Sequence, residues 1–448
     1  MAKRVTFAHV LKYTGVFGGV QALKAVASLV RNKLAAILLG SAGMGLNAIF
    51  QNIGDIIFSA TNMGVPFSST RNLSEAYEND DPQAVSRLVM VIRTWALSTS
   101  IVGALICLCG AWLIDKYFFP DNAHSHIWEI MLLSLYVMSL PIEAAECAIL
   151  KGARQLKSVA SVETIAAIGT ILCTVPFFWL WGVRGVVISL VVCGWMVVGV
   201  HAFYSLRLFP YEVHITQREA YRQGMPLIYL GVPYMLASAS TALCTGFIYG
   251  ILSGESEIGL YKAAYSILVT CAGIAFVAID NDYFPRLSAI NNSLENRNYT
   301  INQQIQVCSL IVGVLLALMV IFMPEIIRML LSEEFLPAVP MAMAGIYYAF
   351  LRSVNLPLGY LPLARGESVV YLIIEVTLNA ITGLLTWLGY QWGGLQGCGV
   401  ALSASAILES GILLTVYGIR YDFKPEARTL LSLTLMALII GITISLSI

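Results

Sequence analysis

The stretch GMGLNAIFQ, residues 43–51, has a counterpart in EIGLYKAAY, residues 257–265. Gly45-Leu46 in the first stretch matches Gly259-Leu260 in the second, at a separation of 214 residues. The same separation aligns two further pairs of dipeptides: Leu73-Ser74 with Leu287-Ser288, and Lys151-Gly152 with Arg365-Gly366. Each match is weak alone, but all of them are collinear. Together they indicate an internal repeat, which is a frequent feature of membrane transporters.

The composition is that of a membrane protein. Of 448 residues, 58% are hydrophobic and only 12% are charged, whereas soluble domains carry about 25% charged residues. Apolar runs long enough to cross a bilayer recur along the whole chain. They predict spans near 9–38, 45–70, 87–114, 127–150, 158–181, 184–206, 224–252, 258–284, 302–330, 340–363, 369–391 and 396–419, with a last apolar run at 429–448.

The loops between these spans differ in basic residues. With the N-terminus inside, sixteen Lys and Arg residues fall in inner loops and three, Lys116, Arg184 and Arg328, in outer loops. This asymmetry predicts a cytoplasmic N-terminus, because inner loops of membrane proteins are enriched in Lys and Arg. Asp81-Pro82 is a helix N-cap followed by proline at the first helical position, so a helix is expected to begin there.

Each half of the repeat holds six spans, so both halves begin on the same side of the membrane. We therefore expect an all-α polytopic membrane protein of two tandem six-helix lobes around a central cleft, with an additional C-terminal transmembrane segment. The predicted lobes are residues 1–210 and 211–428, and the additional segment is 429–448. This architecture favours a transporter over a receptor, with a non-transporting scaffold as an alternative.

The first span contains three basic residues. Lys24 and Arg31 share one helical face with Gln21 and Ser28, which indicates a polar surface turned inward. Lys33 points the other way and lies near the outer end of the span, where a lysine can extend to the membrane interface.

Further charges occur inside the spans of both lobes. Lys262 and Arg352 in the second lobe are expected to join Lys24 and Arg31 in a cationic cleft suited to a pyrophosphate. The predicted cleft or coupling acids are Asp55, Asp280, Glu143, Glu146 and Glu375, and Glu163, Asp282 and Glu409 also fall inside spans. Two alternatives stay open: Asp55 pairs with Lys24 or Arg31 only to join helices, or the acids serve a cation exporter.

The sequence offers no enzyme chemistry. GSAGMG, residues 40–45, joins two spans without the Gly-Lys-Ser or Gly-Lys-Thr of a nucleotide-binding loop. The nine cysteines lie in apolar runs and show no zinc-type pairing. His124 and His126 are read as incidental loop histidines. No catalytic residue, cofactor or metal site is predicted, and equal numbers of basic and acidic residues, 26 each, give no sign of a nucleic-acid partner.

The first ninety residues carry a resemblance. The order LKAVASLVRNKLAAILLGSAGMGLNAIFQ, FSSTRNLSEA and DDPQAVSRLV resembles the polysaccharide, or Wzx-type, branch of the multidrug/oligosaccharidyl-lipid/polysaccharide (MOP) exporter superfamily. The resemblance implies a flippase of the bacterial inner membrane that moves undecaprenyl-pyrophosphate-linked oligosaccharides, including O-antigen units, to the periplasmic leaflet for lipopolysaccharide or other surface polysaccharide. It also implies that Lys24 and Lys33 hold the pyrophosphate.

Three functions follow from these observations. The first is a flippase that works by alternating access, driven by Na⁺ or H⁺, with membrane lipids and a polysaccharide polymerase as further partners. The second is a drug/cation antiporter of the same fold, and the third is a membrane scaffold. The sequence does not name the sugar.

Overall fold

The protein is built from α-helices. The computed structural model describes residues 7–78, 81–120, 125–153, 155–209, 216–289 and 294–447, and no strand occurs among them. The side chains of residues 7–22 and of most positions in 271–289 lie outside this description. The all-α membrane architecture predicted from the apolar runs is confirmed.

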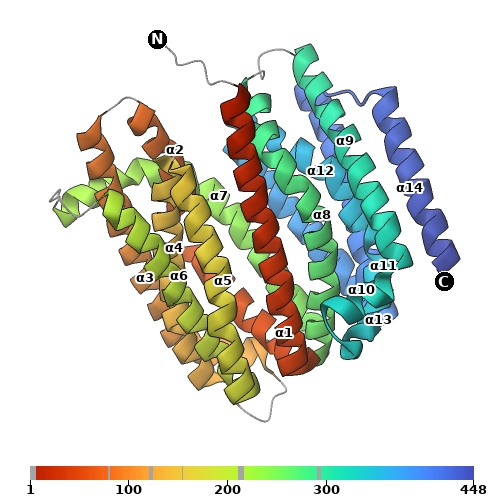
Figure 1. Cartoon of the computed structure of the whole chain (residues 1–448), viewed down its shortest axis with the longest axis horizontal. Coiled ribbons are helices and arrows are strands. Elements are labelled where there is room, and N and C mark those ends of the chain that lie inside the picture. The colour runs from red at the N-terminus through yellow and green to blue at the C-terminus, as the bar shows by residue number, and fades with distance from the viewer. Residues whose placement is uncertain are drawn as a thin grey trace. The chain divides into compact units, whose positions relative to one another are not determined.

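Fourteen α-helices are described, and Figure 1 shows their course. The first half contains α1 (Phe7–Thr61), α2 (Val65–Glu78), α3 (Pro82–Phe118), α4 (Ile127–Gly152), α5 (Leu156–Trp181), α6 (Gly185–Leu208) and α7 (Gln217–Ile251), with a 3₁₀ turn at Gly182–Arg184. The second half contains α8 (Glu255–Ala289), α9 (Leu294–Ile321), α10 (Met323–Leu330), α11 (Val339–Ala344), α12 (Ile346–Ala364), α13 (Ser368–Tyr421) and α14 (Ala427–Ser447), with a 3₁₀ helix at Glu333–Ala338.

Two long helices each hold a kink at glycine. In α1 the kink is at Gly40, with φ of 68°, and in α13 it is at Gly393 and Gly394, where Gly394 has φ of 56°. Glycine adopts these left-handed angles without the clash that a Cβ would cause. The kink in α13 falls between the predicted spans 369–391 and 396–419. The predicted span 45–70 is wrong in one respect, because the helix is interrupted at residues 62–64, before α2 begins.

Length and apolar character make eight of the described helical segments candidate membrane spans, or nine if the bent pair Glu333–Ala344 and Ile346–Ala364 forms one span. Two of these segments, Lys157–Leu208 and Ser368–Tyr421, each contain two of the predicted spans, and Val26–Thr61 contains parts of the predicted spans 9–38 and 45–70. The final segment, Ala427–Leu446, is also long and apolar enough to cross. The protein is therefore a multi-pass membrane protein.

The predicted helix start at Asp81 is confirmed. The Asp81 carboxylate accepts hydrogen bonds from the backbone amides of Gln83 and Ala84 at 3.0 and 3.1 Å, and Pro82 occupies the first helical position. These bonds satisfy two of the amides that a helix leaves unpaired at its N-terminus.

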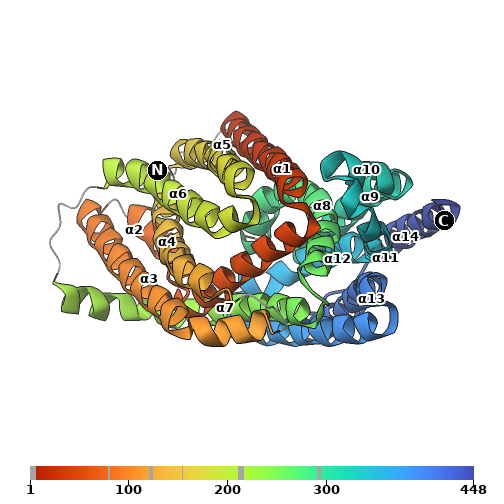
Figure 2. The same ribbon diagram turned by 90° about the horizontal axis from the view of Figure 1, so that it is seen from below.

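The described chain forms two compact units. The N-terminal unit comprises residues 26–39 and 46–250, and the C-terminal unit comprises 1–25, 40–45 and 251–448. In the N-terminal unit α3 packs on α4, α4 on α6 and α5 on α6; in the C-terminal unit α12 packs on α13 and α9 on α14 (Figures 1 and 2). The lobe boundary at 210/211 stays a prediction.

Two glycines matched by the repeat contact each other inside the C-terminal unit. A Cβ on Gly45 would lie 1.8 Å from the Glu255 carbonyl oxygen and 2.9 Å from the Gly259 nitrogen. A Cβ on Gly259 would lie 1.9 Å from the Ser41 carbonyl oxygen. Beside this contact, the Ser41 amide donates a 2.7 Å hydrogen bond to Glu334. The two backbones therefore meet at a distance that only glycine permits.

We expect Gly45→Ala to destabilise the protein by about 1–3 kcal/mol, the usual cost of overpacking a tight contact. The denaturation midpoint of the purified protein in detergent measures the effect. Gly411→Ala is the matched control, because no atom lies within 4 Å of the Cβ position on Gly411 in α13. An equal effect of the two substitutions would contradict the close contact.

Candidate functional site

In the N-terminal unit, charged side chains surround Tyr136 of α4. Arg31 and Asp55 of α1 and Glu143 of α4 all lie close enough for their charges to act on the Tyr136 hydroxyl. Asp55 also acts on Tyr249 of α7. The structure thus brings together three of the predicted site residues, Arg31, Asp55 and Glu143.

Small residues make room for the Tyr136 ring. A Cβ on Gly54 would lie 2.8 Å from Cε1 of Tyr136, and a Cβ on Gly194 would lie 3.0 Å from its Cδ2. The ring is therefore held between α1 and α6.

The other two basic residues of the first span are half-buried. Lys33 belongs to the N-terminal unit, as Arg31 does, whereas Lys24 belongs to the C-terminal unit. Both lysines take part in polar or electrostatic interactions. Gln21, which the sequence places on the face of Lys24, has a side chain outside the described part of the structure.

Glu146 holds three helices together. Its carboxylate accepts hydrogen bonds from Arg93 of α3 at 2.9 and 3.2 Å, and both side chains are nearly fully buried. Arg93 also donates to the Ser205 hydroxyl at 3.1 Å and to the Phe209 carbonyl at 2.8 Å. This two-point ion pair links α3, α4 and the end of α6, which gives Glu146 a structural role. Its predicted place among the cleft acids stays a prediction.

In the C-terminal unit, Arg352 of α12 lies beside two tyrosines. Its guanidinium donates to the Tyr348 hydroxyl at 3.4 Å and lies 6.0 Å from the centre of that ring. The Tyr348 hydroxyl is in turn 3.1 Å from that of Tyr265 on α8. Arg352 is half-buried, so the tyrosines supply part of the polar environment that its charge loses in the membrane.

Two carboxylates face Arg352 from α13. The charges of Glu375 and Glu409 both interact with the Arg352 guanidinium. Close by, Ser410 donates a 2.6 Å hydrogen bond to Asn355. The sequence predicted Glu409 as an acid inside a span but did not predict its place beside Arg352. The kink at residues 393–394 determines which faces of the two parts of α13 meet, and this depends on the fold.

The remaining predicted residues of the second lobe lie on α8. Lys262 is half-buried and takes part in interactions within the described structure. Tyr265, one helical turn later, belongs to the tyrosine pair beside Arg352. The side chain of Asp280 lies outside the described residues.

The two units thus carry similar groups. Each sets one arginine and a tyrosine hydroxyl against two carboxylates: Arg31, Tyr136, Asp55 and Glu143 in the N-terminal unit, and Arg352, Tyr348, Glu375 and Glu409 in the C-terminal unit. We call these groups the Arg31 cluster and the Arg352 cluster. Guanidinium and tyrosine hydroxyl groups can donate hydrogen bonds to an anion, and the carboxylates can bind a cation.

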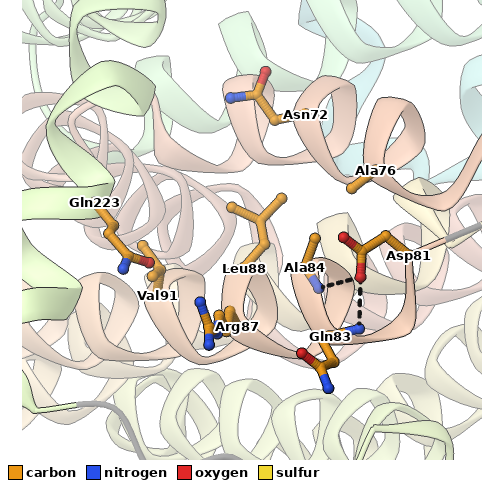
Figure 3. A pocket seen from close by; sticks show the side chains of 9 residues that line it. All are labelled: Asn72, Ala76, Asp81, Gln83, Ala84, Arg87, Leu88, Val91 and Gln223. Atoms are coloured by element: carbon orange, nitrogen blue, oxygen red, sulfur yellow. Dashed lines mark hydrogen bonds between the residues drawn. The ribbon is translucent and has the colours of Figure 1, made fainter. Parts of the chain in front are cut away.

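A separate pocket of about 410 Å³ opens beside the start of α3. Its lining comes from α2, α3 and α7: Asn72, Ala76, Asp81, Gln83, Ala84, Arg87, Leu88, Val91 and Gln223 (Figure 3). The Asp81 carboxylate is occupied in capping α3, as the dashed lines in Figure 3 show. None of the predicted site residues lines this pocket.

Residues 10–291 match the family described as Polysaccharide biosynthesis protein. No curated protein matches the chain in sequence. Among solved structures, the lipid II flippase MurJ in an inward closed conformation has a TM-score of 0.70 at 14% identity, covering 96% of this chain and 98% of its own.

Two transporters of the MOP superfamily have the same fold. A multidrug resistance MATE family transporter in an inward-facing conformation has a TM-score of 0.67 at 13% identity, covering 97% of this chain and all of its own. A transporter from Pyrococcus furiosus, described by the reversed polarity of its binding pocket, has a TM-score of 0.65 at 15% identity, with 96% of both chains covered. At these identities the likeness extends to the fold alone.

Proposed function

The chain belongs to the family of polysaccharide biosynthesis proteins, and on this basis we propose that it is a Wzx-type flippase. It has the fold of MOP superfamily transporters and flippases, which are not enzymes. Its proposed substrate is an undecaprenyl-pyrophosphate-linked oligosaccharide, which it moves from the cytoplasmic to the periplasmic leaflet for surface polysaccharide assembly.

The observation that carries this proposal is the presence of an arginine and a tyrosine hydroxyl inside the apolar helices of each unit. A charge at the centre of a membrane helix costs at least about 2.5–3.5 kcal/mol, so such residues usually serve a function. Arginine presents several N–H groups in a fixed plane and can bind phosphate oxygens at two points. Arg31 and Arg352, with Lys24, Lys33 and Lys262, are therefore proposed to bind the pyrophosphate.

The carboxylates of both clusters suggest how transport is coupled. In each cluster one guanidinium faces two carboxylates, so the named groups carry an excess negative charge when all are ionised. Binding of Na⁺ or H⁺ would neutralise this charge and leave the arginine available to the pyrophosphate. We propose Asp55, Glu143, Glu375 and Glu409 as the groups that bind the coupling ion during alternating access.

The proposed location is the inner membrane of a bacterium, with the N-terminus in the cytoplasm. The excess of Lys and Arg in the predicted inner loops supports this orientation. A polysaccharide polymerase on the periplasmic side would then use the flipped substrate.

We expect Lys24→Ala to lower export more than Lys33→Ala, by about tenfold if Lys24 makes one charge-assisted hydrogen bond to the pyrophosphate. Lys33 has the position of a lysine at the membrane interface, where neutralising the side chain is expected to lower export less. Surface polysaccharide and accumulated lipid-linked oligosaccharide, measured in a host without its own flippase, report the effect at matched protein levels. A larger loss with Lys33→Ala would contradict this order.

A drug/cation antiporter is the second candidate, favoured by the excess of carboxylates in the two clusters. The two functions differ in their response to charge removal. If Arg352→Ala preserved surface polysaccharide but abolished efflux of a cationic drug, the antiporter would replace the flippase. If neither export nor efflux changed while a partner complex was lost, the scaffold function would gain support.

A further inference from the structure

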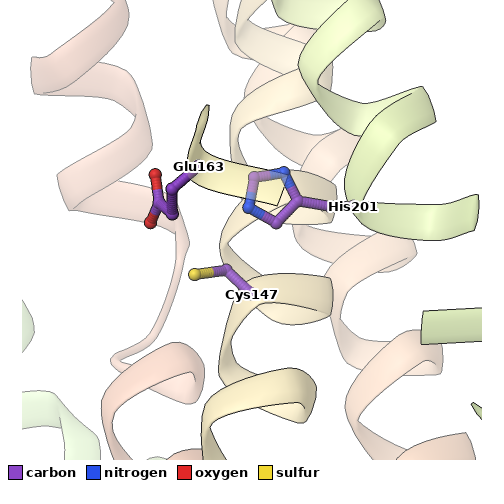
Figure 4. A group of neighbouring side chains, drawn as sticks. All are labelled: Cys147, Glu163 and His201. Carbon is purple, nitrogen blue, oxygen red and sulfur yellow. The ribbon is translucent and has the colours of Figure 1, made fainter. Parts of the chain in front are cut away.

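Three potential metal ligands converge in the N-terminal unit, apart from both arginine clusters. Cys147 lies on α4, Glu163 on α5 and His201 on α6, and their ligand atoms all lie within 4.8 Å of one another. Figure 4 shows the three side chains lying near one another. The three ligands are far apart in the sequence, so no sequence motif predicts the site.

The orientation of His201 leaves one ring nitrogen available to a metal. Nδ1 lies 3.0 Å from the Val197 carbonyl oxygen, which can only accept a hydrogen bond. The neutral ring therefore carries its proton on Nδ1, and the lone pair is on Nε2. Histidine ligands of metal ions are commonly fixed in this way by a backbone carbonyl. The His201 side chain is only 3% exposed, so packing also holds the ring in place.

Glu143 of the Arg31 cluster lies beside these three ligands. It lies one turn before Cys147 on α4, and its Oε1 is 3.9 Å from Nε2 of His201. Zinc bonds of about 2.0–2.3 Å to nitrogen, oxygen and sulfur require ligand atoms roughly 3.3–3.8 Å apart in a tetrahedron. A bound ion would thus draw Cys147, Glu163 and His201 together by about 1 Å, a shift that rotamer changes can supply.

Lys151 balances the charge of such a site. Its ammonium group lies near Cys147 and interacts with the charges of Glu163 and Glu143. Two carboxylates, one thiolate, one ammonium and a divalent ion sum to zero, with His201 neutral. A divalent cation bound to the thiolate form therefore leaves the set without net charge, and neutrality favours burial within a membrane protein.

We propose that Cys147, Glu163 and His201 form a binding site for a divalent transition metal ion of the zinc type. The mixture of one sulfur, one imidazole nitrogen and carboxylate oxygens suits Zn²⁺ and Co²⁺, whereas Mg²⁺ and Ca²⁺ prefer oxygen alone. The ion joins α4, α5 and α6. It braces α4 beside Glu146, the partner of Arg93, and does not depend on the transported substrate.

Cobalt titration of the purified full-length protein, prepared without a polyhistidine tag, tests the site. One equivalent of Co²⁺ is expected to give the near-ultraviolet charge-transfer band of a sulfur–cobalt bond together with the visible bands of tetrahedral Co²⁺. One equivalent of Zn²⁺ should abolish both. Histidines elsewhere, such as His126, cannot produce the sulfur band.

Cys147→Ser should remove the charge-transfer band, and Glu163→Gln should weaken Co²⁺ binding at least tenfold while retaining the band at high Co²⁺. The matched control is Cys193→Ser on α6, whose thiol contacts Thr174 and the Thr170 carbonyl instead; it should keep the band. Absence of the band from the wild-type protein, or its persistence in Cys147→Ser, would overturn the proposal. If Cys147→Ser does not fold, unchanged Co²⁺ affinity in Glu163→Gln overturns it equally.

Discussion

Replacing Arg352 by alanine is expected to lower transport of the lipid-linked oligosaccharide by about tenfold to a hundredfold, since a hydrogen bond to a charged group contributes about 1.5–3 kcal/mol. The substitution also leaves Glu375 and Glu409 without the guanidinium that faces them. Both effects disfavour an anionic substrate. The measurement is the initial rate of substrate flipping at subsaturating concentration, compared at equal amounts of folded protein.

Two further variants make this prediction specific. Arg352→Lys keeps the charge but loses two-point binding, so it should lie between the wild type and the alanine variant. Arg420→Ala removes a half-exposed arginine in the last turn of α13 that pairs with Glu367. This substitution should change the rate of substrate flipping little. If Arg420→Ala and Arg352→Ala had equal effects, a specific role of Arg352 in binding the pyrophosphate would be refuted.

The second large effect is on stability. Arg93→Ala is expected to lower the free energy of unfolding by about 3–5 kcal/mol, because it leaves a buried carboxylate without its partner. Arg93 and Glu146 have side chains only 5% and 6% exposed, so water cannot replace the lost contacts. Unfolding in mixed micelles, followed by denaturant titration, measures this change.

The matched control is Arg71→Ala. Arg71 pairs with Glu75 one turn later, and both side chains are 61% exposed. An exposed pair at this spacing contributes about 0.3–0.5 kcal/mol. If Arg93→Ala cost no more than Arg71→Ala, the ion pair with Glu146 would not be what joins α3, α4 and α6.

Local patterns in the sequence predicted the helices well. Apolar runs identified the spans, and Asp81-Pro82 located the start of α3 because capping depends only on neighbouring residues. The repeat singled out Gly45 and Gly259, which the structure places in contact. The break at residues 62–64 was missed, since Met63 adopts φ of 52°, an angle that is uncommon for residues other than glycine and that its sequence neighbours do not predict.

The sequence could not predict which charges meet. Glu146 was expected among the cleft acids, but its partner Arg93 lies on another helix, 53 residues away. For the same reason, the convergence of Cys147, Glu163 and His201 depends on the packing of three helices. Arg31 and Arg352 were expected as charges inside spans and lie within α1 and α12, while their tyrosine neighbours appear only in the folded units.

The most direct test of the central proposal is a leaflet assay with the purified protein in liposomes. A polyprenyl-pyrophosphate-linked oligosaccharide with a labelled sugar is placed in both leaflets, and a membrane-impermeant glycosidase reports which molecules reach the outer one. We expect the wild-type protein to expose nearly all of the label and Arg352→Ala to expose little beyond the initial outer fraction. Protection of the inner fraction in wild-type liposomes that still transport a cationic dye would contradict the flippase and favour the antiporter.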